Sequence, residues 1–301
     1  MNMLIFAFIP LILSLGIVPA LQSEIVPNAD AIKAKGNSLT ETNSKKVCGD
    51  RLCSSISEHQ SASSSMMIKS EKGLFPSAMD YTVTGPEIDP EKGYSVIEIG
   101  DGLYWLTDGM YQVMFLTTGE GVILVDAPMG MGTKIQQAIS EVTSEKVTHF
   151  IYSHIHKDHV GSSGLLPKET VYISHSDTAE HLKKKNDPQR PVPTVTFDDE
   201  YTLKVGNQVL ELSYLGPFHS KGDIVIYSPM HKVVMAVDLF HPNAGPFLGF
   251  GITTDMNAHL AIHDILLEKY DFEVLVPAHE QILATKDHIK TNKQFVLDVM
   301  E

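Results

Sequence analysis

The order of elements predicted for residues 94–301 indicates an α/β layered domain, in which two β-sheets pack back to back with helices outside. Short β-branched or aromatic segments, separated by turns that contain glycine, predict the strands. Segments with apolar residues at helical spacing predict the helices. Apolar residues make up 43% of the 301 residues and charged residues 20%, which excludes wholesale disorder, collagen-like repeats and a disulfide-rich miniprotein.

The first half of this domain begins with hairpins. Gly-Asp-Gly, Asp-Gly and Thr-Gly-Glu-Gly turns separate four predicted strands, which are Tyr94–Ile99, Leu103–Leu106, Val113–Thr117 and Val122–Val125. A helix is predicted at Lys134–Val142, where the apolar residues recur at helical spacing. A buried strand is predicted at Val147–Tyr152, and a histidine-rich loop follows it directly.

The second half continues the mixture of strands and helices. The predicted strands are Val171–Ser174, Tyr201–Val205, Val209–Tyr214, Ile224–Tyr227, Lys232–Val237 and Val274–Val276. The predicted helices are Ala179–Lys185, Ala258–Tyr270 and Thr285–Glu301.

Residues 1–21 are predicted to be a signal peptide or an N-terminal anchor. No charged side chain precedes Glu24, and the segment is almost wholly apolar. Val18-Pro19-Ala20 offers a cleavage site after Ala20, as in secretory signals. The apolar run is also close to the shortest length that spans a bilayer, so an uncleaved anchor stays open. We therefore expect an exported protein, in the periplasm, the cell envelope or the medium, with any membrane contact made through this segment.

A polar linker is predicted for residues 22–93. It is rich in Ser, Lys, Glu and Asn and shows no persistent periodicity, so much of it is expected to be disordered. Cys48 and Cys53, the two cysteines of the chain, lie within it. In an exported protein two close cysteines most simply form a small disulfide loop, and we assign them no catalytic role.

The net charge of the chain limits the classes of partner that it is expected to bind. Lys and Arg number 23 and Asp and Glu 37, which gives a formal net charge of −14. A protein that grips a phosphate backbone needs concentrated Lys and Arg, so no nucleic-acid partner is expected. A small-molecule substrate is expected instead, and the sequence does not indicate an oligomeric state.

Candidate metal ligands are concentrated directly after the strand predicted at Val147–Tyr152. The segment His154-Ile-His156-Lys-Asp158-His159 places four of them in six residues. In an extended segment residues two apart point the same way, so His154 and His156 can converge on one ion. Asp158 and His159 lie past the bend and can turn toward a second ion. A zinc site that keeps one position open for water is typical of catalysis.

Further candidate ligands follow other predicted strands. His219 comes after Val209–Tyr214, Asp238 ends Lys232–Val237, and His279 follows Val274–Val276. Asp126, at the end of Val122–Val125, joins the same edge. Loops that leave a rigid scaffold are where functional residues gather, so we expect one site at this edge.

In this order, Asp126, His154-x-His156-x-Asp158-His159, His219, Asp238 and His279 resemble the five motifs of the metallo-β-lactamase superfamily. The resemblance covers roughly residues 95–285 and implies a four-layer αβ/βα sandwich of two mixed β-sheets flanked by helices. It implies a hydrolase domain over residues 94–301 that binds two Zn²⁺ ions per chain.

The resemblance also implies a role for each ligand. His154, His156 and His219 would hold the first metal, and Asp158, His159 and His279 the second, with Asp238 bridging the two. Asp126 would lie behind the ligands and orient their loop, as hydrogen-bonding partners of metal ligands do. Asp158 would either be a ligand only or also act catalytically, by orienting the nucleophile and accepting its proton.

A zinc-dependent hydrolase is therefore expected, in which a metal-bridging hydroxide attacks the carbonyl of an ester, lactone, thioester or lactam. The residue at Asp238 favours the thioesterases, lactonases and phosphodiesterases of the family over its best-known lactamases. Two alternatives stay open: a β-lactamase proper, and a non-catalytic metal-binding envelope protein on the same fold. Retention of every ligand position favours the enzyme over the binding protein.

The segment after Asp238 is predicted to form an apolar wall over the metals. It carries Phe240, Phe247 and Phe250 among glycines, and His241 can reach a substrate oxygen. The alternative is an ordinary buried loop. A wall of this kind indicates a small, partly apolar substrate.

Overall fold

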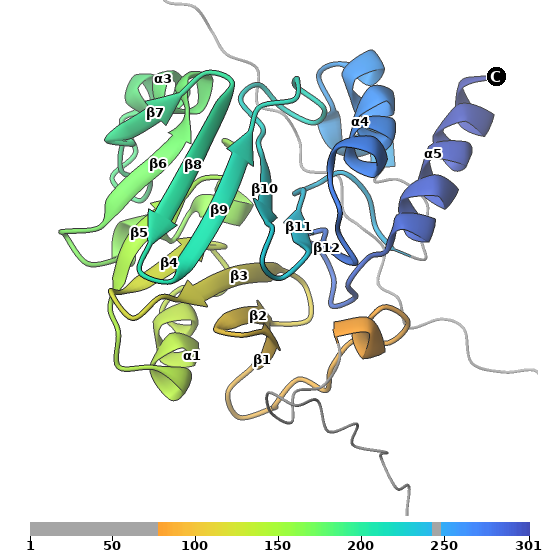
Figure 1. Ribbon diagram of the computed structural model, residues 1–301. Helices are drawn as coiled ribbons and strands as arrows, with labels where there is room; N and C mark the ends of the chain where they lie inside the picture. The colour runs from red at the N-terminus through yellow and green to blue at the C-terminus, as the bar shows by residue number, and fades with distance from the viewer. Residues whose placement is uncertain (1–77, 243–247) are drawn as a thin grey trace, which may run out of the picture. The chain divides into compact units, whose positions relative to one another are not determined.

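The computed structural model describes residues 78–242 and 248–301, and these form two β-sheets with helices on their outer faces (Figure 1). One sheet has seven strands in the order β1-β2-β3-β4-β5-β6-β7 and the other has five in the order β12-β11-β10-β9-β8. The predicted fold class is confirmed. The predictions for residues 1–21, for the linker as far as residue 77 and for Cys48 and Cys53 lie outside the described residues.

The seven-stranded sheet changes from antiparallel to parallel at β4. Its strands are β1 (Ser95–Gly100), β2 (Leu103–Thr107), β3 (Gln112–Thr117), β4 (Val122–Val125), β5 (Val147–Ile151), β6 (Val171–His175) and β7 (Val195–Phe197). Successive pairs from β1 to β4 are antiparallel and those from β4 to β7 are parallel. Parallel neighbours need a crossover, which helices supply. The connecting helices are α1 (Lys134–Val142), α2 (Lys157–Val160), η2 (Ser163–Leu165) and α3 (Ser176–Lys185).

The five-stranded sheet has one parallel pair. Its strands are β8 (Glu200–Val205), β9 (Gln208–Ser213), β10 (Val225–Ser228), β11 (Val233–Met235) and β12 (Val274–Val276). The pair β11–β12 is parallel, and the long α4 (Met256–Lys269) makes its crossover. The remaining elements are η1 (Ala78–Tyr81), η3 (Leu248–Ile252) and α5 (Lys286–Met300).

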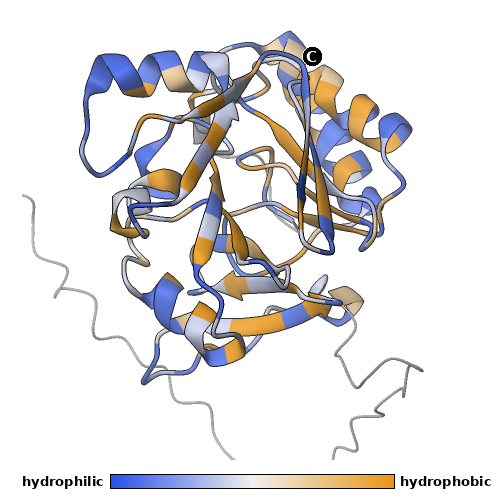
Figure 2. Cartoon of the chain, turned by 60° about the vertical axis from the view of Figure 1, so that its left-hand side comes forward, coloured by the Kyte–Doolittle hydropathy of each residue, from blue (hydrophilic) through white to orange (hydrophobic). Residues whose placement is uncertain are grey.

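Strand sequences fit this layering because their residues alternate between two apolar interfaces. In β4, Ile123 and Val125 pack between the sheets, whereas Val122 and Leu124 pack under the outer helices, and all four are buried. Figure 2 shows apolar residues concentrated along the strands. Three apolar clusters result, one between the sheets and one under the helices of each sheet. The helices α1 and α3 lie on one side and α4 and α5 on the other (Figure 1).

The N-terminal boundary of the folded unit differs from the prediction. Residues 78–93 were assigned to the linker, but they pack on the domain. The Tyr81 ring lies 5.5 Å from the Trp105 ring, and the Tyr81 carbonyl accepts a hydrogen bond from the Leu283 amide. The prediction was wrong for these residues because tertiary contacts, which leave no periodic pattern, hold them. Across the described ranges no helix is long and apolar enough to cross a membrane.

The topology brings the predicted ligands to one edge of the molecule. The parallel pairs β4–β5 and β11–β12 direct their carboxyl ends toward it. Asp126 follows β4, His154 follows β5, Asp238 follows β11 and His279 follows β12. The loop between β9 and β10 adds His219 at the same edge.

Candidate metal centre

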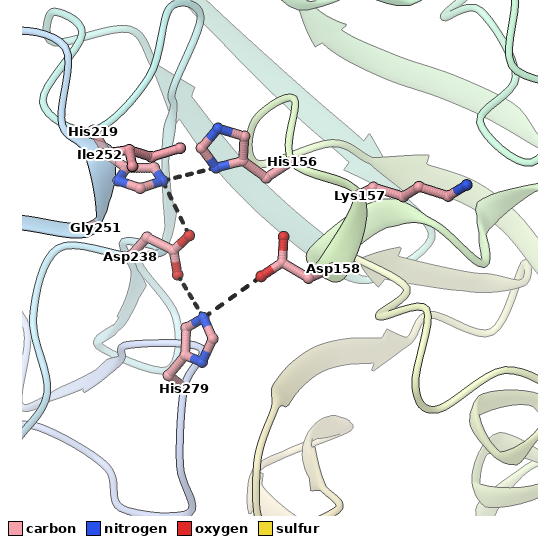
Figure 3. A pocket seen from close by; sticks show the side chains of 8 residues that line it. All are labelled: His156, Lys157, Asp158, His219, Asp238, Gly251, Ile252 and His279. Carbon is pink, nitrogen blue, oxygen red and sulfur yellow. Dashed lines mark hydrogen bonds and ion pairs between the residues drawn. The ribbon is translucent and has the colours of Figure 1, made fainter. Parts of the chain in front are cut away.

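The seven predicted metal ligands lie together in two groups. His154, His156, His219 and Asp238 form the first group, and Asp158, His159 and His279 form the second. Within each group the candidate ligand atoms all lie within 4.8 Å of one another. Figure 3 shows Asp238 between His219 of the first group and His279 of the second.

Distances in the first group match the edges of a zinc coordination shell. His219 Nε2 lies 2.9 Å from His156 Nδ1 and 3.1 Å from Asp238 Oδ2. His154 Nε2 lies 3.4 Å from the same Asp238 oxygen. Tetrahedral ligands at zinc distances are separated by about 3.3 Å. These atoms are therefore spaced to surround one small cation.

The second group uses the other oxygen of Asp238. Asp238 Oδ1 lies 3.0 Å from His159 Nε2 and 3.1 Å from His279 Nε2. The two imidazole nitrogens are 3.0 Å apart, and Asp158 Oδ2 lies 3.4 Å from His159 Nε2. One carboxylate thus presents one oxygen to each group, which is the arrangement of a bridging ligand.

Burial of the first group fits a bound cation. His154 and His219 are 1% and 2% exposed, and Asp238 is 5% exposed. His154 Nε2, although buried, finds no hydrogen-bond partner in the described part of the chain. A buried polar atom without a partner is costly, and a metal ion at this point would satisfy it. The donor set of imidazoles and carboxylates is one that zinc accepts.

The electrostatics of the cluster show what a cation would replace. Burial lowers the pKa of His154 to about 3, which keeps its imidazole neutral and able to bind metal. Burial opposes ionisation of Asp238, but the positive charge of His159 and the adjoining His154 and His219 imidazoles hold its pKa well below the usual range. Burial also opposes protonation of His159, yet Asp238 and other carboxylates raise its pKa to about 9. In the metal-free protein, the positive charge of protonated His159 therefore balances the negative charge of the Asp238 carboxylate.

Asp126 orients His154 through Ser153. Asp126 Oδ1 accepts the Ser153 amide at 3.0 Å and Oδ2 accepts the Ser153 hydroxyl at 2.7 Å. The hydroxyl oxygen, having donated its proton, accepts from His154 Nδ1 at 2.8 Å. This order places the imidazole proton on Nδ1 and leaves the Nε2 lone pair for a metal. Asp126 is fully buried, which raises its pKa to about 6, so it is ionised at neutral pH.

Backbone strain is concentrated at the same edge. Asp126, Asp238, Ala278 and Glu280 all have positive φ angles, between 60° and 76°. Non-glycine residues rarely adopt this conformation, and it clusters at functional sites where the surrounding structure imposes it. The four residues are ligands, neighbours of ligands or partners of a ligand loop.

A cavity of about 340 Å³ opens over the cluster. Besides metal-ligand candidates from both groups, its lining includes Lys157, Gly251 and Ile252 (Figure 3). Ile252 is 74% exposed, has a φ of 60° and belongs to η3. Both residues lie in the segment predicted to form a wall over the metals, but the sequence did not single them out, because an isolated Gly-Ile pair carries no signal of its own.

The predicted apolar wall is only partly supported. Phe240 is fully buried in the cluster under α4 and does not line the cavity, so the prediction was wrong for this residue. The Phe250 ring lies 6.0 Å from the His259 ring and is likewise absent from the lining. Phe247 lies outside the described residues. His241 Nδ1 lies 2.9 Å from Glu280 Oε1, and the His241 ring lies 5.8 Å from that of His279.

One aromatic residue from the β2–β3 hairpin also reaches the site. The Tyr111 ring lies 4.9 Å from the His279 ring and 5.4 Å from the His159 ring. Tyr111 therefore packs against two candidate ligands of the second group.

Comparison with known proteins agrees with this geometry. The chain is 27% identical over 143 residues to the 2,4-dinitroanisole O-demethylase subunit alpha of a Nocardioides species, a match that covers 46% of this chain and 44% of that protein. It is 24% identical over 174 residues to the metallo-beta-lactamase type 2 of Bacillus cereus, covering 56% of this chain and 66% of that protein. The chain thus spans less than two thirds of either relative.

Solved structures share the fold. A metallo-beta-lactamase from Pontibacter korlensis superposes with a TM-score of 0.59 at 18% identity, over 68% of this chain and 99% of that one. The family model described as the metallo-beta-lactamase superfamily matches residues 106–279, a span that contains all seven candidate ligands. Because this match covers more than half of the chain, the protein belongs to the metallo-beta-lactamase superfamily.

Proposed function

We propose that the protein is a dizinc hydrolase that acts on the carbonyl of a small, neutral, partly apolar ester, lactone or thioester. The observation that carries the proposal is Asp238, whose two oxygens face two separate ligand groups at 3.0–3.4 Å. A carboxylate placed in this way suits two ions side by side. Imidazole and carboxylate ligands favour zinc, and the proposed stoichiometry is two per chain.

The zinc ions, when bound, would lower the pKa of a coordinated water to about 7 and polarise a substrate oxygen. The protein's own carboxylates divide the remaining work. The Asp238 side chain is 6% exposed and serves to hold metal. The Asp158 side chain is 44% exposed and borders the cavity, so it can orient an attacking water and accept its proton. Exposure therefore favours the catalytic role for Asp158 in addition to its role as a ligand.

The cavity supports a small substrate that carries no charge. Its volume of about 340 Å³ lies at the low end of ligand pockets. Lys157 is the basic residue of the lining, and its Nζ lies 3.7 Å from Asp187 Oδ2, directed away from Asp238 (Figure 3). In the sequence no Lys or Arg occurs between Lys232 and Lys269, the stretch that contains the loop after Asp238. Among the described residues of the lining, Lys157 is thus the one lysine or arginine that could hold a substrate carboxylate, and it already pairs with Asp187, whereas exposed Ile252 offers an apolar surface.

A matched pair of substrates tests this proposal. The purified, zinc-loaded protein would be assayed with the 4-nitrophenyl esters of hexanoic acid and of adipic acid, which differ by a terminal carboxylate. We expect chelator-sensitive hydrolysis that is lost in His156→Ala, with kcat/KM about 10-fold or more higher for the neutral ester. Equal turnover of the two esters, or turnover that survives removal of metal, would contradict it.

A β-lactamase is the second candidate, because curated relatives at 24–28% identity are named metallo-beta-lactamase type 2. Penicillins and cephalosporins carry a carboxylate, for which the described lining offers only Lys157, whose ammonium group pairs with Asp187. A chromogenic cephalosporin in the same assay separates the two candidates. Preference for the cephalosporin over the neutral ester would favour the lactamase.

A further inference from the structure

We propose that two buried side chains outside the metal cluster, Gln112 and Arg190, each position one half of the two-metal site. Gln112 acts on the second ligand group and Arg190 on the first. Neither side chain belongs to the candidate ligand groups, and each donates a hydrogen bond to a backbone carbonyl of a ligand loop. The inference rests on the proposed two-metal site and treats both residues as positioning residues.

Gln112 begins β3 and is fully buried. Its Nε2 donates to the carbonyls of His279 at 2.6 Å and Ile282 at 3.1 Å. Its Oε1 accepts from the Trp105 indole nitrogen at 2.9 Å. Because the two carbonyls need a donor and the indole N–H needs an acceptor, only one orientation of the side-chain amide satisfies all three hydrogen bonds.

The loop that Gln112 holds is strained. Ala278 and Glu280, on either side of His279, have φ angles of 76° and 63°. Residues that carry a Cβ rarely adopt this conformation, because the Cβ then crowds the backbone. The backbone amide of Gln112 also donates to the Ala278 carbonyl at 2.8 Å, and the backbone amide of Glu280 donates to the Met110 carbonyl at 2.8 Å. The Gln112 side chain thus helps to keep a strained loop in the conformation that presents the His279 imidazole.

Arg190 makes the corresponding contact behind the first group. It is 8% exposed, and its guanidinium donates to the Ile155 carbonyl at 2.8 Å. Ile155 lies between His154 and His156, so this bond fixes the short segment that sets the spacing of both imidazoles. The Arg190 Nε donates to Asp187 Oδ2 at 3.1 Å, which balances the buried charge and locks the guanidinium plane.

The two contacts lie on different parts of the fold. Gln112 belongs to β3 and holds the loop after β12, whereas Arg190 lies between α3 and β7 and holds the loop after β5. The Ile155 carbonyl lies between two ligands of the first group, whereas the His279 carbonyl belongs to a ligand of the second group. Loss of either contact should therefore weaken mainly one metal position, and loss of such partners typically lowers metal affinity about 10- to 100-fold.

Four variants of the full chain test the inference by zinc titration against a chromophoric chelator. Gln112→Met and Arg190→Met remove the donors at similar volume. Gln208→Met is the matched control, because Gln208 is 1% exposed and also pairs with a backbone carbonyl and a ring nitrogen, but contacts no candidate ligand. Arg190→Lys keeps a cationic donor and should recover part of the affinity. Thermal unfolding of the metal-free proteins reports the loss of stability separately.

Single-site backgrounds assign each effect. His156→Ala disables the first group, and there Gln112→Met should lower zinc affinity about 10- to 100-fold while Arg190→Met changes it little. Asp158→Ala weakens the second group, and there the order should reverse. If Gln112→Met lowers affinity no more than Gln208→Met, or if both variants weaken both positions equally, the inference is wrong. If the unaltered protein binds no zinc, the proposed function fails instead.

Discussion

Replacement of Asp126 by Asn should disable His154 as a metal ligand without unfolding the protein. Asp126 accepts both the amide and the hydroxyl of Ser153, and the hydroxyl oxygen accepts from His154 Nδ1. An Asn side chain that keeps the bond from the Ser153 amide turns its NH₂ group toward the hydroxyl. The hydroxyl must then donate to His154 Nδ1, which moves the imidazole proton to Nε2. That proton occupies the position that the metal needs.

The magnitude of this effect follows from the same contacts. Loss of such a hydrogen-bonded partner lowers metal affinity about 10- to 100-fold, or about 1.4–2.7 kcal/mol. Stability should move the other way. The pKa of Asp126 is about 6 in the folded chain against 3.8 for the unperturbed group, so the folded state binds its proton more tightly. The penalty for ionising Asp126 is absent below pH 3.8 and reaches about 3 kcal/mol above pH 6, and Asn removes it.

The assay compares metal affinity with stability in one set of samples. Zinc titration gives the affinity, urea unfolding of the metal-free protein at pH 8 gives the stability, and ¹⁵N chemical shifts report the His154 tautomer. Asp223→Asn is the control for the tautomer, because Asp223 is also buried with a pKa raised to about 6 by burial. It accepts the backbone amides of the ligand His219 and of Ser220 but no imidazole proton, so the His154 tautomer should stay unchanged in this variant. Unchanged zinc affinity and tautomer in Asp126→Asn would refute the reasoning.

Three further predictions concern the site and the core. Because the pKa of His159 is about 9 in the metal-free chain, its proton must leave before a metal binds, and zinc affinity should therefore rise about tenfold per pH unit up to pH 9. Calorimetry in buffers of different ionisation enthalpy would detect the released proton, and a zinc affinity that does not change with pH would contradict the prediction. Ile252→Ala should lower kcat/KM about 10-fold for a hexanoyl ester but not for an acetyl ester, because Ile252 lines the cavity. Its free energy of unfolding should stay within about 0.5 kcal/mol of that of the unaltered protein, because Ile252 is 74% exposed. Leu124→Ala should destabilise the fold by about 2–5 kcal/mol in urea titrations, because Leu124 is fully buried under the outer helices. A loss of stability below about 1 kcal/mol would contradict this and show that the layer repacks around the smaller side chain.

The sequence predicted most of the fold because strand and helix patterns are local. The alternation in Val122–Val125 and the helical spacing in Lys134–Val142 depend on which faces are buried, and both elements form where they were predicted. The strand β7, Val195–Phe197, was missed because three residues beside prolines carry little pattern. Residues 78–93 were misassigned because long-range contacts such as the Tyr81–Trp105 ring pair hold them.

The candidate ligands could be identified from sequence because chemistry restricts them. A run such as His154-x-His156-x-Asp158-His159 has few uses besides metal binding. The other candidate ligands each follow a predicted strand, which predicted that they meet at one edge of the sheets. Side chains that act through the backbone leave no such record. Gln112 lies in an otherwise apolar strand, and Arg190 touches only the Ile155 carbonyl of the ligand loop. Phe240 was misplaced because its burial depends on how α4 packs.

Metal stoichiometry tests the two-metal account most directly. The purified, metal-free protein would be titrated with zinc by isothermal calorimetry, beside Asp238→Ala, and the bound metal would be counted by elemental analysis after gel filtration. The account predicts two zinc ions per chain, with both binding steps weakened in Asp238→Ala, because each oxygen of Asp238 faces one ligand group. A single zinc per chain, or a loss confined to one step in Asp238→Ala, would contradict it.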